Sequence, residues 1–171
     1  APVRLQELIQ WGVELDKNNS GELDLGLEGG HSQNRIVHHK DKTGLEIETK
    51  LIQVVQNLAN VTIRTSFFAT DVLLDNQKCI GIIGFDEKSE VTSIVAKATI
   101  LATGGSGQVF GVTSNPFVST GDGVAMAYRA GAKLEKMKYI QFHPTALYEP
   151  NKSQAFLITE GIRGFGAHVL N

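Results

Sequence analysis

The chain has 171 residues, of which 42% are hydrophobic and 20% charged, a composition typical of a globular protein and not of a disordered one. Its formal net charge is −2 and its charges form no block of one sign, so nucleic acid and anionic membranes are not indicated as partners. The single cysteine, Cys79, excludes an internal disulfide framework and favours a reducing, cytoplasmic location. No apolar run has the length of a transmembrane helix, and the chain length predicts one domain with a hydrophobic core.

Apolar residues at helical spacing predict two early helices. The first runs from Val3 to Trp11 and stops at Gly12, because glycine favours the end of a helix. The second begins at Thr43-Gly44-Leu45-Glu46, which fits a capping box, and continues to Leu58.

Short β-branched segments separated by polar turns predict an antiparallel meander. The strands are expected at residues 61–64, 67–74, 79–85, 91–95 and 98–101. The last of these breaks into Thr103-Gly104-Gly105, where missing side chains let backbone amides approach a ligand. The alternative is a tight turn after a core strand that binds nothing.

Another glycine motif, Gly121-Asp122-Gly123, is expected to open a helix that ends at Gly131. Thr120 or Asp122 would cap this helix, and its free N–H groups suit an anion. The alternative is that Asp122 only caps the helix. Residues 133–141 are then expected to form a connecting segment and a strand.

The polar residues of the last thirty positions suggest a site for a small anionic substrate. If residues 160–164 form a helix, Glu160 and Arg163 lie one turn apart and pair. This pair is either a surface ion pair of little consequence or a guanidinium held ready for a substrate carboxylate. Candidate donors nearby in the sequence are His143, Thr145 and Thr159.

No other chemistry is indicated. His38 and His39 are adjacent and would point to opposite sides of an extended chain, and no residues have metal-ligand spacing. Cys79 lies in an apolar strand without a nearby histidine, so nucleophilic catalysis is unsupported.

Taken in order, short motifs along almost the whole chain resemble the flavoprotein family of L-aspartate oxidase, succinate dehydrogenase and fumarate reductase. They are Glu28-Gly29-Gly30-His31-Ser32, Asp41-Lys42-Thr43-Gly44, Ala102-Thr103-Gly104-Gly105, Thr120-Gly121-Asp122-Gly123, Gln141-Phe142-His143-Pro144-Thr145 and Thr159-Glu160 with Arg163-Gly164. One departure is Phe165, where the family usually has glutamate.

Within this family the resemblance is strongest to the aspartate oxidases, because they typically carry a glutamate where Glu28 stands. The dicarboxylate enzymes have an apolar residue there. A carboxylate aimed at the substrate ammonium would separate aspartate from succinate.

The resemblance also implies the site residues. FAD would contact Ala69, Thr103, Gly104, Gly105 and Asp122. Substrate would be bound by Glu28, His143, Thr145, Thr159 and Arg163, and the catalytic residues would be His143, Glu160 and Arg163. No metal is implied.

The fold class implied is α/β with α+β character: part of a FAD-binding domain, with an antiparallel meander, flanking helices and the start of a capping domain. Residues 1–136 would be a partial FAD-binding domain without the N-terminal Rossmann unit, and residues 137–171 the start of a truncated capping domain. Gly105, Gly107 and Gly111 do not have the spacing of a dinucleotide-binding turn, and the acid/base arginine of the family is expected beyond Asn171. We therefore expect an internal piece of a longer enzyme, inactive alone.

The implied reaction is the oxidation of L-aspartate, or another C4 dicarboxylate, with oxygen or fumarate as the electron acceptor. The product, iminoaspartate, leads to quinolinate and NAD, so quinolinate synthase is the expected pathway partner. Two alternatives stay open: a succinate dehydrogenase or fumarate reductase flavoprotein, and a non-catalytic structural or interaction domain.

Overall fold

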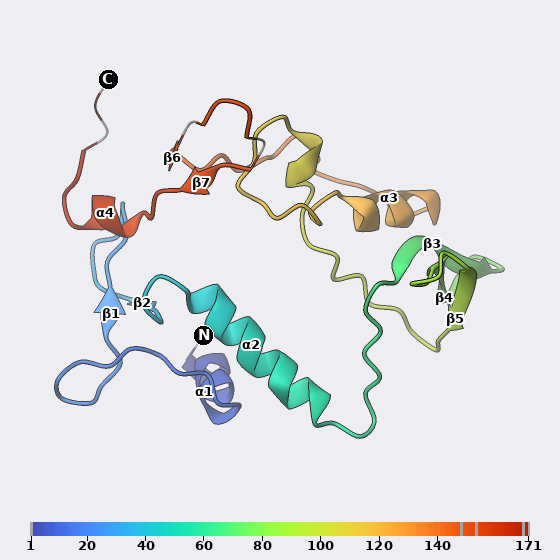
Figure 1. Ribbon diagram of the computed structural model, residues 1–171, viewed down its shortest axis with the longest axis horizontal. Helices are drawn as coiled ribbons and strands as arrows, with labels where there is room; N and C mark the ends of the chain where they lie inside the picture. Colours follow the sequence, from blue (N-terminus) through green and yellow to red (C-terminus); the bar gives the residue numbers. More distant parts are fainter. Residues whose placement is uncertain (1, 148, 153, 169, 171) are drawn as a thin grey trace. The chain divides into compact units, whose positions relative to one another are not determined.

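The computed structural model describes residues 2–147, 149–152, 154–168 and 170 (Figure 1). Its helices are α1 (Pro2–Gln10), α2 (Thr43–Gln56), α3 (Asp122–Arg129), α4 (Gly161–Gly164) and a 3-10 turn, η1 (Gly107–Val109). The strands are β1 (Leu25–Gly26), β2 (Ile36–Val37), β3 (Phe68–Asp75), β4 (Lys78–Phe85), β5 (Val91–Val95), β6 (Ala146–Leu147) and β7 (Phe156–Leu157). These elements form two units, residues 1–63 with 159–171 (unit 1) and residues 64–158 (unit 2).

Unit 1 contains the two predicted early helices and a short antiparallel pair, β1 with β2. Helix α2 begins at Thr43, but the predicted capping box is wrong. Thr43 Oγ1 accepts a hydrogen bond from the amide of His39, and Glu46 accepts one from the amide of Glu14 at 2.9 Å. Both side chains therefore connect α2 to other segments, because those segments offer amides that compete with the helix's own first turn.

Unit 2 is built on the predicted meander, in which β3, β4 and β5 pair in sequence order and antiparallel (Figure 1). Helix α3 packs against β3. Two glycines of β4 allow close approach on either side, since a Cβ at Gly81 would overlap the carbonyl oxygen of Ile94 and one at Gly84 would overlap that of Phe68. The register of the sheet therefore depends on missing side chains.

Replacing Gly81 with alanine should destabilise unit 2 by about 3 kcal/mol, because the added methyl group forces β5 away from β4. Urea unfolding monitored by circular dichroism measures the change. Gly111→Ala is the matched control, since its Cβ would meet nothing within 4 Å, and it should change stability by less than about 0.5 kcal/mol. Equal stability of both variants would show that the register tolerates the methyl group.

Three predicted strands are not present. Residues 61–64 and 133–141 have no strand, and residues 98–101 form an extended segment without ladder pairing. Ile100 in that segment is 89% exposed. The prediction of a buried strand there was wrong because an apolar run becomes a strand only when it pairs with another, and the described sheet ends at β3 and β5 without taking up this segment.

The hydrophobic core expected from the chain length is small. Among the described residues, only Val13 and Met126 are buried hydrophobic side chains. Many large apolar side chains on both units are exposed, including Phe142 at 82% and Phe165 at 90%.

Candidate functional site

In unit 2, the glycine loop predicted to contact a cofactor rests on the start of helix α3. A Cβ on Gly123 would overlap the side chain of Thr103, and one on Gly121 would lie 2.9 Å from the Cβ of Ser106. Gly104 has a φ of 74°, and a Cβ built on it meets nothing within 4 Å. The loop therefore lies against the helix on one side and keeps open backbone on the other, which gives a ligand access to its amides.

The first turn of α3 offers two kinds of hydrogen-bonding group. Its N-cap is Gly121, in a left-handed conformation and without a side-chain cap. The predicted caps were wrong, because the Thr120 hydroxyl donates to the Asp122 carboxylate at 2.6 Å and neither side chain caps the helix. The start of the helix can thus donate hydrogen bonds from its free N–H groups, while the Asp122 carboxylate can accept them. This combination fits a ligand that has both hydroxyl groups and acceptor oxygens, as FAD has.

Ala69, the remaining predicted cofactor residue, lies on β3 opposite Gly84. Strand β3 is fastened to α3 by Arg129, whose Nε donates to Asp71 at 2.5 Å and whose Nη2 donates to the carbonyl of Thr70. The predicted cofactor residues thus lie on the glycine loop, on helix α3 and on strand β3. The loop contacts α3, and α3 in turn contacts β3.

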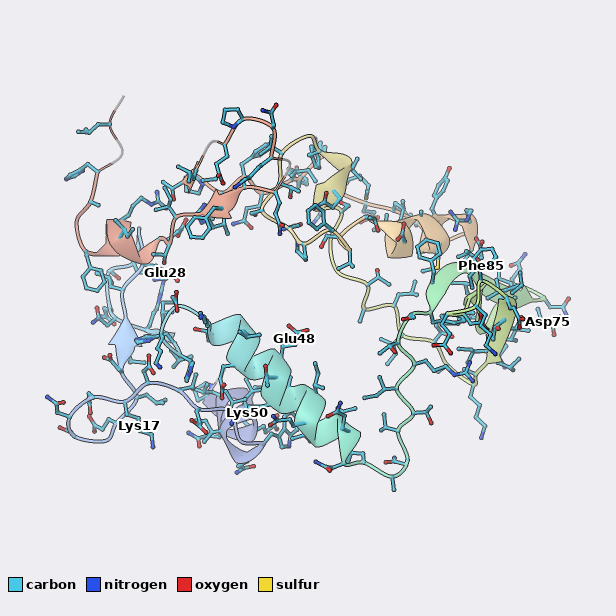
Figure 2. The ribbon with its side chains drawn as sticks, viewed as in Figure 1. Lys17, Glu28, Glu48, Lys50, Asp75 and Phe85 are labelled. Carbon is cyan, nitrogen blue, oxygen red and sulfur yellow. The ribbon has the colours of Figure 1, made fainter. Side chains whose placement is uncertain are left out.

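In unit 1, Glu28 lies on the loop between β1 and β2, and this loop packs directly against α4 (Figure 2). A Cβ on Gly29 would lie 3.4 Å from Cβ, Cζ and Nη2 of Arg163, and one on Gly164 would overlap the carbonyl of Leu27. Two predicted substrate residues of opposite charge, Glu28 and Arg163, are therefore neighbours through Gly29. Residue spacing alone did not connect these two segments, although the family resemblance assigned Glu28 and Arg163 to one substrate site.

Helix α4 forms as predicted and carries the expected pair. Arg163 Nη2 donates to Glu160 Oε1 at 2.7 Å, with the two side chains 31% and 30% exposed. The Thr159 hydroxyl oxygen accepts a hydrogen bond from the amide of Gly161 at 3.2 Å, which satisfies a free N–H at the helix start. Glu160 thus fixes one edge of the guanidinium and Thr159 stabilises the turn that holds it.

In unit 2, the predicted residues His143 and Thr145 are brought together at the beginning of β6. His143 Nδ1 lies 3.2 Å from the amide nitrogen of Thr145, which donates to it, and 2.9 Å from the carbonyl oxygen of the same residue. The Thr145 hydroxyl donates to the carbonyl of Ile158 at 3.2 Å, closing the β6–β7 hairpin. The imidazole is therefore held by its own turn, in which Pro144 restricts the backbone of His143 to an extended conformation.

The two adjacent histidines have structural contacts. His38 Nδ1 lies 3.0 Å from Asp16 Oδ2 and its Nε2 lies 3.7 Å from Asp24 Oδ2, while His39 Nδ1 lies 2.9 Å from the carbonyl of Glu14. The amide of Lys40 donates to the same Asp16 oxygen at 2.6 Å. This backbone hydrogen bond, followed by the nearby His38, lowers the pKa of Asp16 below its usual 3.8 despite the opposing effect of desolvation.

A lowered pKa in the folded state makes the stability of unit 1 depend on acidity. Asp16 stabilises the fold at any pH above its unfolded pKa, and the contribution disappears as the pH falls through the lower, folded value. Asp16→Asn should therefore unfold more easily than wild type at neutral pH, and the difference should vanish in strong acid. Urea unfolding across this range measures it, with Asp41→Asn as a control of equal charge change. A difference that persists at the acid end would contradict the assignment.

No group of three or more His, Cys, Asp or Glu among the described residues could hold a metal ion. In the same part of the chain, no helix combines the length and apolar character needed to cross a membrane. One polar residue beside the site was not predicted: His31, whose amide donates to the carbonyl of Glu28 at 3.0 Å. The sequence did carry a signal for it: His31 follows Glu28 by three residues with two glycines between them, a spacing typical of a β-turn that brings its first and last residues together.

Comparison with known proteins agrees with this arrangement. The sequence matches the FAD binding domain family over residues 1–171. It is 44% identical to the chloroplastic L-aspartate oxidase of Arabidopsis thaliana over 99% of the chain and 28% of that protein, and 42% identical to the L-aspartate oxidase of Acinetobacter baylyi over 95% of the chain and 31% of that protein. The chain thus spans less than a third of the length of these curated relatives.

Solved structures of a fumarate reductase and of an Sdh1 complex are similar to this chain in fold. Quinol fumarate reductase FrdA of E. coli is 30% identical with a TM-score of 0.89, covering 96% of the chain and 28% of that protein. The Sdh1 complex of Mycobacterium smegmatis is 36% identical with a TM-score of 0.83, covering 95% of the chain and 30% of that protein. The resemblance to the flavoproteins of aspartate oxidase, succinate dehydrogenase and fumarate reductase is confirmed, and the chain belongs to the FAD binding domain family.

Proposed function

We propose that this chain is part of a flavoprotein that oxidises L-aspartate to iminoaspartate. The observation that supports the proposal is the contact between the Glu28 turn and Arg163: a Cβ on Gly29, the residue after Glu28, would lie 3.4 Å from the guanidinium carbon of Arg163. L-Aspartate has an ammonium and two carboxylates, so it needs groups of both charges. Succinate lacks the ammonium and gives Glu28 nothing to bind. The names of the curated relatives support the same substrate.

The chain's own residues would bind and orient the substrate. Arg163, held by Glu160 at 2.7 Å, would bind a substrate carboxylate, with Thr159 at the start of the same helix as a further hydrogen-bonding group. Glu28 would bind the ammonium and, as a carboxylate, accept its proton when the C2–N bond is oxidised. His143 and Thr145 are proposed to bind a carboxylate as well.

The oxidation removes a hydride from C2 and a proton from the amino group, which leaves a C2–N double bond. FAD, when bound, supplies the acceptor for this hydride and passes the electron pair on to oxygen or fumarate. Thr103, Gly104, Gly105 and Asp122 would hold the cofactor from the glycine loop and the start of α3, and Ala69 from β3.

The wider context is also a proposal. Residues 1–136 would belong to the FAD-binding domain and residues 137–171 to a capping domain. Because the chain spans less than a third of its curated relatives, we propose that it is inactive alone. The product would pass to quinolinate synthase on the way to NAD.

A second candidate is favoured by the solved structures, which include a quinol fumarate reductase. In this case the flavoprotein would interconvert succinate and fumarate, and Glu28 would be only a loop residue. The third candidate, a purely structural domain, is less favoured because the turn that carries Glu28 packs against Arg163, so that two proposed substrate residues lie in one place.

Turnover by the FAD-loaded flavoprotein that contains this chain tests the proposal. We expect oxidation of L-aspartate, which is measured as flavin bleaching in the absence of oxygen and as hydrogen peroxide formation in its presence. Succinate should give at least about 100-fold lower kcat/KM, which corresponds to one unpaired buried charge. Succinate turnover without aspartate oxidation would favour the second candidate. The isolated 171-residue chain should show neither activity.

A further inference from the structure

Two buried nitrogen atoms of unit 1 have no hydrogen-bond partner among the described residues: Nδ1 of His31 and Nε of Arg163. Buried polar atoms in native proteins are nearly always paired, so an unpaired one calls for an explanation such as a ligand. Both atoms belong to residues on the Glu28 turn or on the helix packed against it. They therefore point to one local function and not to scattered defects.

The backbone explains how His31 comes to this place. Its amide donates to the carbonyl of Glu28 at 3.0 Å, which closes a four-residue β-turn. Gly30 has a φ of 84°, the left-handed conformation that the third position of a type II turn requires. The turn thus holds Glu28 and His31 at its two ends, while Gly29 in its middle lies against the guanidinium of Arg163.

The two unpaired nitrogens have compatible chemistry. Arginine Nε carries a hydrogen at all working pH values and can only donate. Imidazole Nδ1 donates in one neutral tautomer and in the protonated form. A carboxylate accepts from both, and charge-assisted hydrogen bonds of this kind are short and strong. The His31 side chain as a whole is partly exposed, so a small rotation on binding would turn its Nδ1 toward a ligand.

We propose that His31 is a further substrate-binding residue, donating from Nδ1 to a substrate carboxylate that Arg163 also contacts through Nε. This inference rests on the proposed function and extends it. The Glu28–His31 turn then recognises both charges of an α-amino acid: Glu28 binds the ammonium and His31 contributes to a carboxylate. The two glycines between them bring the groups to the two ends of one turn.

Three variants of the FAD-loaded flavoprotein test this proposal. In His31→Asn the amide nitrogen stands two bonds from Cβ, as Nδ1 does, whereas in His31→Gln it stands one bond further, closer to Nε2. His31→Ala removes both. We expect Kd values for L-aspartate, obtained from the concentration dependence of the anaerobic flavin-reduction rate, to rise roughly 10- to 100-fold in the alanine and glutamine variants, and to stay within about threefold of wild type in the asparagine variant.

The controls separate binding from folding. FAD content and melting temperature should be equal in the asparagine and glutamine variants, which would show that both fold normally. If His31 had only a structural role, these two variants would not differ in their affinity for the ligand. Unchanged Kd values in all three variants would overturn the proposal. Equal weakening in asparagine and glutamine variants would also overturn it, since Nδ1 would then not be the contact.

The inference can fail independently of the proposed function. Aspartate oxidation by wild type with unchanged Kd in His31→Gln removes His31 from the site and leaves the function intact. If wild type instead oxidises succinate, the function is wrong, and weakened succinate binding in His31→Gln but not in His31→Asn still supports His31 as a carboxylate contact.

Discussion

Replacing Glu28 with glutamine in the FAD-loaded flavoprotein is expected to lower kcat/KM for L-aspartate at least about 100-fold. Glutamine keeps the size and the hydrogen-bonding oxygen but removes the charge that would face the substrate ammonium. Loss of one charge-assisted hydrogen bond in a protected site costs about 3 kcal/mol of transition-state stabilisation. The loss should occur mainly in KM if Glu28 only binds the ammonium, and in kcat as well if it also favours loss of the amino proton.

Two comparisons make this result specific. Glu48→Gln removes the same charge from α2 in the same unit, where the side chain lies on the exposed face, and should leave kcat/KM unchanged (Figure 2). Binding of succinate should not weaken in Glu28→Gln, because succinate has no ammonium. Equal loss of aspartate and succinate binding would mean that Glu28 supports the fold of the loop and does not select the substrate.

Local structure was the part of this protein that the sequence predicted best. The helix at Thr43–Gln56 and the meander of β3, β4 and β5 follow from residue spacing and from polar turns between apolar runs. These elements form between near neighbours in the chain. Their signals are therefore complete within a short window of sequence.

The failed predictions concern which partner a strand or a side chain finds, whether that partner lies far away or within a few residues. The apolar run at residues 98–101 has strand composition, but it has no strand beside it in the described part of the chain. The caps proposed at Thr43 and Asp122 failed because Thr43 accepts from the amide of His39 and Asp122 from the hydroxyl of Thr120. A residue type restricts what a side chain can bind and does not decide which partner comes near.

The candidate site shows the same division. The pairing of Glu160 with Arg163 was predictable, because helical spacing alone brings them within reach. The contact between Gly29 and Arg163 was not, since it joins segments at opposite ends of the chain. Gly29 and Gly164 are small residues that let a loop and a helix touch, and a glycine in a sequence does not reveal what approaches it.

Arg163→Lys is expected to lower kcat/KM for L-aspartate about 100-fold, the second large effect. Lysine keeps the positive charge, but it has neither the Nη2 that donates to Glu160 nor the Nε that we propose for the substrate carboxylate. Glu160→Gln should cost less, about 10-fold, because it weakens the hold on the guanidinium and leaves the guanidinium itself in place. Steady-state kinetics over a range of aspartate concentrations measures both.

The double variant decides between a shared and a separate role. If Glu160 acts by orienting Arg163, adding Glu160→Gln to Arg163→Lys should lower kcat/KM little further. The loss of transition-state stabilisation in the double variant should then be smaller than the sum of the two single losses. Arg35→Lys, at an exposed position of the same unit, controls for the general effect of this exchange and should be neutral. Full additivity would mean that Glu160 touches the substrate or a proton on its own. An Arg163→Lys enzyme with wild-type kcat/KM would show that the planar fork of the guanidinium is not required, because a point charge would then serve as well.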